Sequence, residues 1–171
     1  MKYADKLLLY AVTDRSWLGG KTLYEEVEHA IQGGVTFVQL REKRLEDTAF
    51  LKEAQEIQKL CKKYHVPFVI NDNVEIAARI HADGVHIGQS DMEVKKARER
   101  LGNERIIGVS AQTVEQAVGQ RGTAPTIVSV GRYSRQVPRW MPWKWITRRY
   151  GRSAGQFRFR LLPSEALQKI M

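Results

Sequence analysis

Short apolar runs alternate with longer amphipathic ones over the first 118 residues of the chain. The apolar runs cover residues 7–13, 35–40, 67–70, 84–87 and 106–109. They lack the alternation of polar and apolar residues found in half-exposed strands, so they predict parallel strands covered on both faces. The amphipathic runs predict helices over residues 23–32, 47–64, 74–81 and 92–101, with a further helix starting at 113–118. This pattern predicts an α/β fold with five strand–helix units.

Local signals mark the ends of several of these helices. Thr22 is placed to cap the first helix, and Gly33 with Gly34 ends it. Gly102 stops the fourth helix in the same way. The second and longest helix carries apolar residues at helical spacing, which predicts one face packed against the sheet.

Polar side chains follow four of the five predicted strands, at residues 39–43, 71–72, 88–91 and 108–110. An open doubly wound sheet and a (β/α)₈ barrel both accommodate the alternation of elements. In a barrel, however, the carboxyl ends of the strands converge on one mouth, where active sites lie. A complete barrel takes about 200 residues or more. We therefore expect an incomplete (β/α)₈ TIM barrel of about five βα units over residues 1–118, followed by a tail.

The residue types at these strand ends suit a diphosphate and a metal ion. Arg41 and Lys43 are two residues apart, so on an extended strand end they face the same way and can grip a diphosphate together. Asp72 and Asp91 end neighbouring strands and suit Mg²⁺, which needs few carboxylates when phosphate oxygens complete its shell. Taken singly, the cations are also typical of an exposed loop, and Asp72, Asp91 and Ser110 of turns or helix caps.

Charge changes abruptly after residue 118. Residues 1–118 hold 17 Lys and Arg against 18 Asp and Glu, whereas residues 119–171 hold 11 Lys and Arg against one acid. The net charges are −1 and +10, which together give the +9 of the whole chain. Three of the four Trp also lie in the last part. The two parts therefore need separate explanations.

Other features bear on the compartment. No run approaches the ~18–20 apolar residues of a membrane span, and the first apolar stretch is too short for a secretory signal. The single cysteine, Cys61, excludes an internal disulfide and is expected to be a core thiol. His81 and His86 flank a predicted strand and are interpreted as packing or supporting residues rather than metal ligands. We expect a cytoplasmic protein with no membrane partner.

Five stretches of the chain resemble thiamine phosphate synthase, a (β/α)₈ barrel family, in order and in spacing. They are YAVTD at 10–14, QLREK at 39–43, VIND at 69–72, ADGVHIGQSD at 82–91 and IGVS at 107–110. The resemblance implies a transferase of thiamine biosynthesis that joins hydroxymethylpyrimidine diphosphate to thiazole phosphate and releases pyrophosphate. Its expected partners are these two small-molecule substrates.

The resemblance also implies roles for individual residues. Arg41, Lys43 and Asn71 take catalytic positions around the pyrimidine diphosphate. Gln39 helps them to bind this substrate, and Ser110 contacts its pyrimidine. Mg²⁺ is the implied cofactor, held against the diphosphate by the two acidic residues Asp72 and Asp91. Fixed cations and a metal ion stabilise the charge that accumulates on a departing pyrophosphate.

The family's second half cannot be read from the chain as it stands. A Gly-Ala-Asp-Tyr strand, a Pro-Thr-x-Thr-Lys loop and a Gly-Gly phosphate motif are expected, and none is present. Codons can nevertheless be chosen for residues 132–141 so that a two-base offset reads Leu-Phe-Pro-Thr-Ser-Thr-Lys. The same offset reveals the other two motifs within 122–127 and 156–171. We interpret residues 119–171 as an aberrant basic tail from a shifted reading frame, with the shift near residues 118–120, rather than as an independent domain.

Three alternatives remain open. A basic, Trp-rich tail suits RNA, although a frame-shifted tail predicts no specific nucleic-acid partner. The loss of the loop for the second substrate predicts impaired activity, so an inactive fragment that at most binds pyrimidine diphosphate is the second alternative. The third is a protein similar to thiazole tautomerase, against which the cation pair and the carboxylate pair argue, because a tautomerase needs no diphosphate site.

Overall fold

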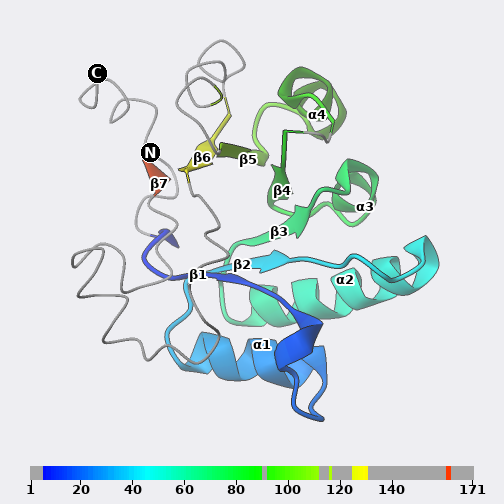
Figure 1. Ribbon diagram of the computed structural model, residues 1–171, viewed down its shortest axis with the longest axis vertical. Helices are drawn as coiled ribbons and strands as arrows, with labels where there is room; N and C mark the ends of the chain where they lie inside the picture. Colours follow the sequence, from blue (N-terminus) through cyan, green and yellow to red (C-terminus); the bar gives the residue numbers. More distant parts are fainter. Residues whose placement is uncertain (1–5, 90–91, 112–115, 117–124, 131–160, 163–171) are drawn as a thin grey trace.

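The predicted alternation of strands and helices is present in the structure, a computed structural model that describes residues 6–89, 92–111, 116, 125–130 and 161–162 (Figure 1). The strands are β1 (Tyr10–Val12), β2 (Phe37–Leu40), β3 (Phe68–Asn71), β4 (Gly84–Ile87), β5 (Ile106–Ala111), β6 (Ile127–Val130) and β7 (Leu161–Leu162). The helices are the short 3₁₀ helix η2 (Arg15–Trp17), α1 (Leu23–Gln32), α2 (Asp47–Lys63), α3 (Val74–Arg79) and α4 (Val94–Leu101).

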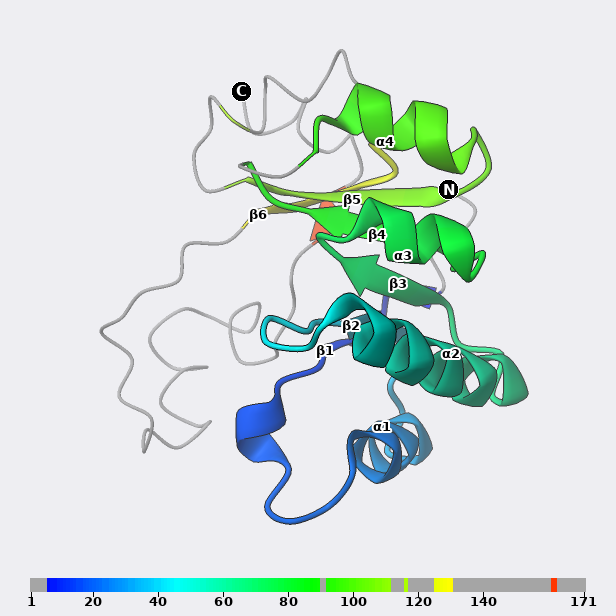
Figure 2. The ribbon, with the colours of Figure 1, turned by 90° about the vertical axis from the view of Figure 1, so that its right-hand side faces the viewer.

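All strands form one sheet in the order of the sequence, β1 to β7. Strands β1 to β6 are parallel, and β7 pairs antiparallel with β6. The sheet curls, and the four α-helices lie along its convex side (Figures 1 and 2). The architecture is therefore half of a barrel, which confirms the predicted incomplete (β/α)₈ fold. The sixth parallel strand, β6, is one more than the sequence predicted.

Some boundaries differ from the prediction. The first apolar run was expected to form a strand over residues 7–13, but β1 covers only Tyr10–Val12 and Leu8 is 70% exposed. Strand β1 is the first strand of the sheet, with β2 as its neighbour, and of the residues before it Leu7 still packs against an apolar cluster whereas Leu8 is exposed. The helix expected at 113–118 lies outside the described residues except for Gln116.

Helix α1 begins as the sequence predicts. The Thr22 hydroxyl accepts a hydrogen bond from the Glu25 amide at 3.2 Å, and the Glu25 carboxylate accepts one from the Thr22 amide at 2.7 Å. This reciprocal capping box satisfies two amide groups that the first helical turn leaves without helical partners. Leu23, Val27 and Ile31 then face the sheet and are buried.

Two apolar clusters lie on opposite faces of the sheet. The larger one fills the space between the strands and the helices and includes the fully buried Cys61, as expected for a core thiol. The smaller one lies on the concave face and contains Tyr10, Phe37, Val69, Ile106 and Ile127. The rings of Tyr10 and Phe37 stack there with centroids 4.5 Å apart. In the part of the chain that the structure describes, no helix is long and apolar enough to cross a membrane.

Candidate functional site

A row of polar side chains lies on the concave face, just beyond the inner apolar cluster. Because side chains alternate between the two faces of a strand, a residue two positions after an inner apolar residue also points inward. On β2, β3 and β6 the polar residue comes two positions after such an apolar residue, and on β4 and β5 it comes two positions after a glycine. The row consists of Gln39, Asn71, His86, Ser110 and Ser129. It therefore lies toward the carboxyl ends of the strands, as predicted for Gln39, Asn71 and Ser110.

Gln39 and Asn71 are connected in the buried half of this row. The Tyr10 hydroxyl donates a hydrogen bond to Gln39 Oε1 at 2.9 Å. Gln39 Nε2 in turn donates to Asn71 Oδ1. Burial raises the pKa of Tyr10, so this hydroxyl keeps its proton and remains a donor at neutral pH. The chain of hydrogen bonds fixes which way both amide groups face.

His86 and two serines form the other half of the row. His86 Nε2 lies 2.9 Å from Ser110 Oγ and 3.4 Å from Ser129 Oγ, and the two hydroxyl oxygens are 3.4 Å apart. Gln89 Nε2 also donates to the Ser110 carbonyl oxygen at 2.6 Å. The Ser110 hydroxyl is thus held by side chains of β4 and β6, which directs it toward the concave face.

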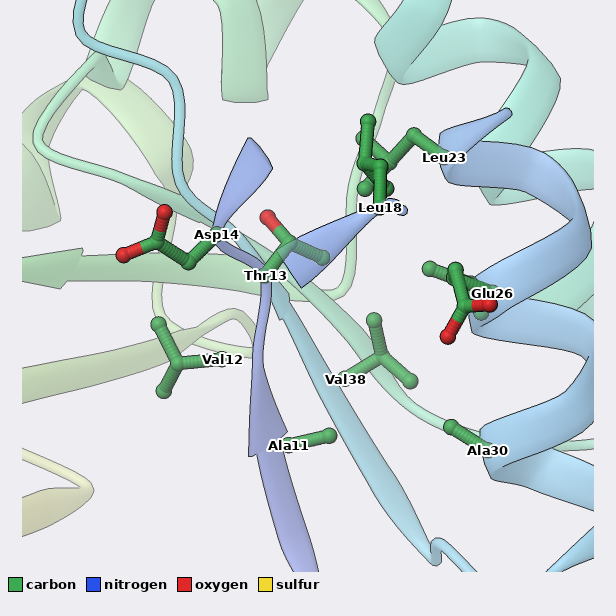
Figure 3. Close-up of a pocket in the computed structure, with 10 residues that line it drawn as sticks. Ala11, Val12, Thr13, Asp14, Leu18, Leu23, Glu26, Ala30 and Val38 are labelled. Carbon is green, nitrogen blue, oxygen red and sulfur yellow. The ribbon is translucent and has the colours of Figure 1, made fainter. Parts of the chain in front are cut away.

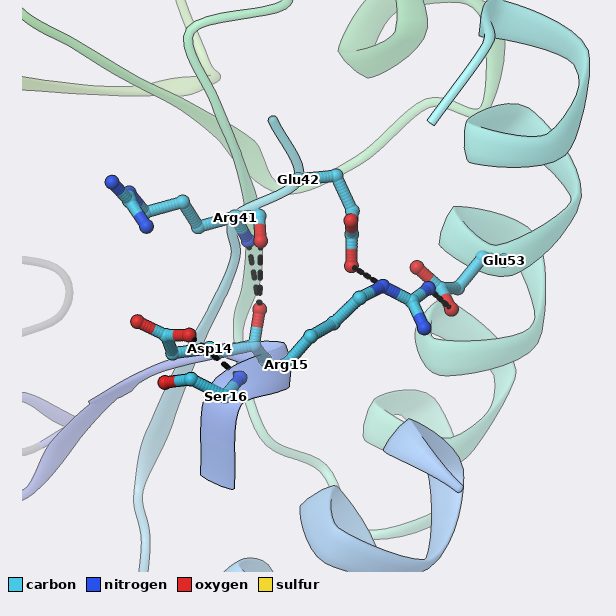
Figure 4. A network of polar contacts seen from close by, with 7 residues as sticks. Asp14, Arg15, Ser16, Arg41, Glu42 and Glu53 are labelled. Atoms are coloured by element: carbon cyan, nitrogen blue, oxygen red, sulfur yellow. Dashed lines mark hydrogen bonds and ion pairs between the residues drawn. The ribbon is translucent and has the colours of Figure 1, made fainter. Parts of the chain in front are cut away.

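The loop after β2 carries the predicted cations. The Arg41 amide donates to Thr13 Oγ1 at 2.9 Å, and the same hydroxyl donates to the Arg41 carbonyl oxygen at 3.4 Å. The Glu42 side chain turns toward α2, whereas the Arg41 side chain points the opposite way (Figure 4). The backbone of this loop is therefore attached to the end of β1.

An open depression of about 500 Å³ lies at the carboxyl ends of β2 and β3. Lys43, Asn71 and Asp72 all line it, so the structure brings these three predicted residues together. Arg41 is not part of its lining, and a joint grip by both cations remains a prediction. Asp72 has a left-handed backbone with φ of 64°, and its amide donates to the His86 carbonyl oxygen at 2.8 Å. Such a conformation at the end of a strand is uncommon outside turns and functional sites.

The carboxylates expected to bind a metal ion are only partly described. Asp72 lies at the mouth of the depression, where a carboxylate suits Mg²⁺. Asp91 lies outside the described residues, so the structure does not place the predicted pair together. Over residues 6–89 and the other described segments, no group of three or more His, Cys, Asp or Glu gathers as a metal cluster. A Mg²⁺ ion that is held largely by phosphate oxygens needs no such cluster.

A second, smaller cavity of about 180 Å³ lies between β1 and α1 (Figure 3). Its walls are largely apolar and include Ala11, Leu18, Leu23 and Val38. Only the acidic side chains Asp14 and Glu26 bring charge to it, which does not suit a phosphate. The candidate site is therefore the depression together with the polar row.

Comparisons with known proteins bear on this site. The profile of the family described as thiamine monophosphate synthase matches residues 9–137. The chain belongs to this family. The match covers the polar row and the loop after β2, and it extends beyond residue 118 to include β6.

Individual family members agree with this assignment. The chain is 50% identical over 123 residues to the thiamine-phosphate synthase of Clostridium acetobutylicum, covering 72% of this chain and 58% of that protein. It is 45% identical over 125 residues to that of Clostridioides difficile, covering 73% and 60%. The solved structure of thiamine phosphate pyrophosphorylase from Pyrococcus furiosus superposes with a TM-score of 0.70 at 28% identity, over 96% of this chain and 69% of that one. The matched region thus spans about three-fifths of the curated relatives' length.

Sequence reasoning missed three members of this polar network. Tyr10 was assigned only to a strand, Ser129 lay in the part treated as tail, and His86 was given a general supporting role. A usable signal was present for His86 because it is two residues after Gly84 and therefore shares the inner face with Asn71 of the neighbouring strand. The hydrogen bonds that join these residues needed the tertiary structure.

Proposed function

We propose that this chain carries the half of a thiamine-phosphate synthase site that binds hydroxymethylpyrimidine diphosphate with Mg²⁺. The reaction proposed for the complete site is its condensation with thiazole phosphate, which yields thiamine phosphate and pyrophosphate. The observation that carries the proposal is the shared depression of Lys43, Asn71 and Asp72 beside the polar row. It places a cation, an amide and a carboxylate next to buried groups suited to a polar ring.

The family resemblance suggests a role for each residue, and the shared depression supports those of Lys43 and Asn71. Lys43 and Arg41 neutralise the diphosphate, and the Asn71 amide hydrogen-bonds it. Gln39 and Ser110 orient the aminopyrimidine ring from the inner face, with His86 holding the Ser110 hydroxyl. Fixed donors aimed at a leaving group stabilise the charge that it gains as its bond breaks. The thiazole nitrogen then attacks the methylene carbon from which pyrophosphate has departed.

The Asp72 carboxylate that lines the depression suits a bound Mg²⁺. Asp72 would supply one oxygen ligand beside the diphosphate, and Asp91, four residues after the end of β4, is proposed as the second. When bound, the ion neutralises phosphate charge as a Lewis acid. This dependence on Mg²⁺ is a prediction for the present chain.

We further propose that turnover by this chain is impaired. The family's loop for the second substrate is not readable in residues 119–171, and loss of positioning groups can cost orders of magnitude in rate. The domain proposal is that residues 1–118 form the family part and residues 119–171 a basic tail from a shifted frame. The family match, however, extends to residue 137, and it includes strand β6, so resemblance to the family continues past residue 118.

The nucleotide sequence tests the frame proposal. One inserted or deleted base near codons 116–122, with the family motifs continuing in the other frame, would support it. The same change near codon 131 would move the start of the tail but keep the proposal. An uninterrupted frame in which those motifs never reappear would refute it.

Calorimetry and a product assay test the functional proposal on the full chain. Hydroxymethylpyrimidine diphosphate should bind in the presence of Mg²⁺, and Lys43→Ala should weaken binding by at least about tenfold, equal to about 1.4 kcal/mol. Lys52→Ala, on the outer helix α2, is the matched control and should have no effect. Absence of binding would refute the proposal, and formation of thiamine phosphate at a normal rate would refute impairment.

A cytoplasmic location is proposed on the basis of the family's soluble substrates.

A further inference from the structure

The loop after β2 contains a buried acid between its two cations. Glu42 lies between Arg41 and Lys43 in sequence, and its side chain is only 3% exposed. An uncompensated carboxylate at this position would repel a diphosphate. Instead Glu42 turns away from Arg41 and accepts a hydrogen bond from Arg15 Nε at 2.8 Å (Figure 4).

Arg15 also reaches a second acid on the longest helix. Its terminal nitrogen pairs with Glu53 of α2, whose side chain is 18% exposed. Desolvation and the neighbouring Glu42 raise the pKa of Glu53, although Arg15 acts in the opposite direction. One guanidinium thus joins η2, the loop after β2 and helix α2, which are distant in sequence.

The cluster of Arg15, Glu42 and Glu53 holds the loop through the Glu42 side chain, and Thr13 holds it through the backbone of the preceding residue. Thr13 bonds both the amide and the carbonyl of Arg41. With the backbone attached at residue 41 and the side chain attached at residue 42, the direction in which the Arg41 side chain leaves the backbone is set. The side chain points away from Glu42 and Glu53 (Figure 4).

We propose that Arg15, Glu42 and Glu53 are positioning residues that set the direction of Arg41 and Lys43 for binding a diphosphate. The identity of the anion rests on the proposed function, whereas the positioning of the loop does not. Glu42 also lines the depression, but its carboxylate is paired with Arg15, so in this proposal the acids act through the loop backbone and not as ligands of the anion. Pairing with Arg15 thus turns Glu42, whose charge alone would oppose anion binding, into a residue that holds the binding loop in place.

Charge and positioning make opposite predictions for the removal of Glu42. Coulomb's law alone predicts that loss of a negative charge near the site strengthens binding of inorganic pyrophosphate. Positioning predicts that Glu42→Gln weakens it, by about tenfold, because the fold-change then reflects a misdirected loop. Glu46→Gln is the matched control, since Glu46 is an exposed acid of the same loop that makes no side-chain cap hydrogen bond.

The experiment measures two quantities on the full chain. The first is the dissociation constant for inorganic pyrophosphate with Mg²⁺, by calorimetry, for wild type, Glu42→Gln, Arg15→Met and Glu46→Gln. The second is the hydrogen-exchange rate of the Arg41 amide without ligand, relative to core amides such as those of β3. We expect weaker binding and at least tenfold faster exchange for Glu42→Gln and Arg15→Met, with no change for Glu46→Gln.

Each outcome decides one of the two proposals. Unchanged Arg41 exchange in both cluster variants overturns the positioning proposal, whatever happens to binding. If Arg15→Met weakens binding but leaves the exchange of the Arg41 amide unchanged, Arg15 is a direct ligand of the anion, and the positioning proposal is again overturned. If wild type does not bind pyrophosphate, the proposed function fails, and the exchange rates still decide whether the cluster orders the loop. If Glu42→Gln does not fold, Arg15→Met still tests the proposal, because the Arg15 side chain is 42% exposed and its replacement disturbs the core less.

Discussion

Gly108 of β5 leaves the space that the His86 ring occupies on the neighbouring strand β4. A Cβ atom at residue 108 would lie 2.3 Å from His86 Nδ1, which is closer than any real contact. The two residues are paired in the parallel register of β4 and β5. The absence of a side chain at one position therefore allows a buried imidazole at the other, and that imidazole holds the Ser110 hydroxyl.

Gly108→Ala should destabilise the protein by about 1–3 kcal/mol, the usual cost of overfilling a packed interior. Urea unfolding monitored by circular dichroism measures this change. The clash is with a side chain, so His86→Ala in the same molecule should relieve part of it. The double variant should therefore lose less stability than the sum of the losses of the two single variants.

Gly84→Ala is the contrasting variant. A Cβ atom there would lie 2.0 Å from the backbone carbonyl oxygen of Ile106, which no side-chain truncation can relieve. We expect His86→Ala to leave the cost of Gly84→Ala unchanged. Equal coupling of His86→Ala with both glycine variants would contradict the assignment of the Gly108 clash to the imidazole.

Asp72→Asn should remove most of the dependence of pyrophosphate binding on Mg²⁺, because an amide oxygen is a weaker ligand than a carboxylate for a hard cation. The measurement is a Mg²⁺ titration at constant pyrophosphate. Glu75→Gln is the control, since Glu75 lines the same depression but pairs with Arg100 at 2.8 Å. A similar loss in both variants would indicate a general charge effect instead of ligation by Asp72.

Cys61 should resist thiol reagents in the folded protein. It is fully buried, and desolvation raises the pKa of its thiol to about 12, so the reactive thiolate is scarce below that pH. Labelling by iodoacetamide at pH 8 should proceed only as the protein unfolds and become rapid in guanidinium chloride. Rapid labelling under native conditions, followed by mass spectrometry, would show that α2 does not stay packed on the sheet.

The capping box of α1 should make stability depend on acid pH. Hydrogen bonds from the Thr22 amide and hydroxyl lower the pKa of Glu25 below its ordinary value of 4.5. Because the pKa of Glu25 is lower in the folded state, its carboxylate stabilises the fold fully above the unfolded-state pKa. This stabilisation is lost as the pH falls through the folded-state pKa. The stability difference between wild type and Glu25→Gln should therefore shrink from pH 7 to pH 3.

Thr22→Ala removes the other half of the capping box and should cost about 1 kcal/mol at pH 7. Its cost and that of Glu25→Gln should not add, because both variants alter the hydrogen bond that the Thr22 hydroxyl donates to the Glu25 carboxylate at 2.8 Å. Thermal unfolding of the single and double variants checks this. Full additivity would mean that the two residues act separately.

The sequence predicted most of the half-barrel because its strands and helices are specified by local pattern. Helix α1 begins at its capping Thr22, and β4 has the predicted bounds. Strand β6 was missed because its four residues lie in the part interpreted as a frame-shifted tail, and the structure pairs them with β5. The predicted helix 113–118 and the ligand Asp91 lie outside the described residues and stay predictions.

The sequence by itself determined that Gln39, Asn71 and Ser110 would lie at strand ends, because strand parity and the parallel order follow from local residue types. Only the tertiary structure decided what those residues contact. Tyr10 contacts Gln39, and His86 and Ser129 contact Ser110, through hydrogen bonds between strands. Arg15 reaches Glu53 across 38 residues of sequence. Such contacts depend on how closely strands and helices pack, and no local pattern encodes that distance.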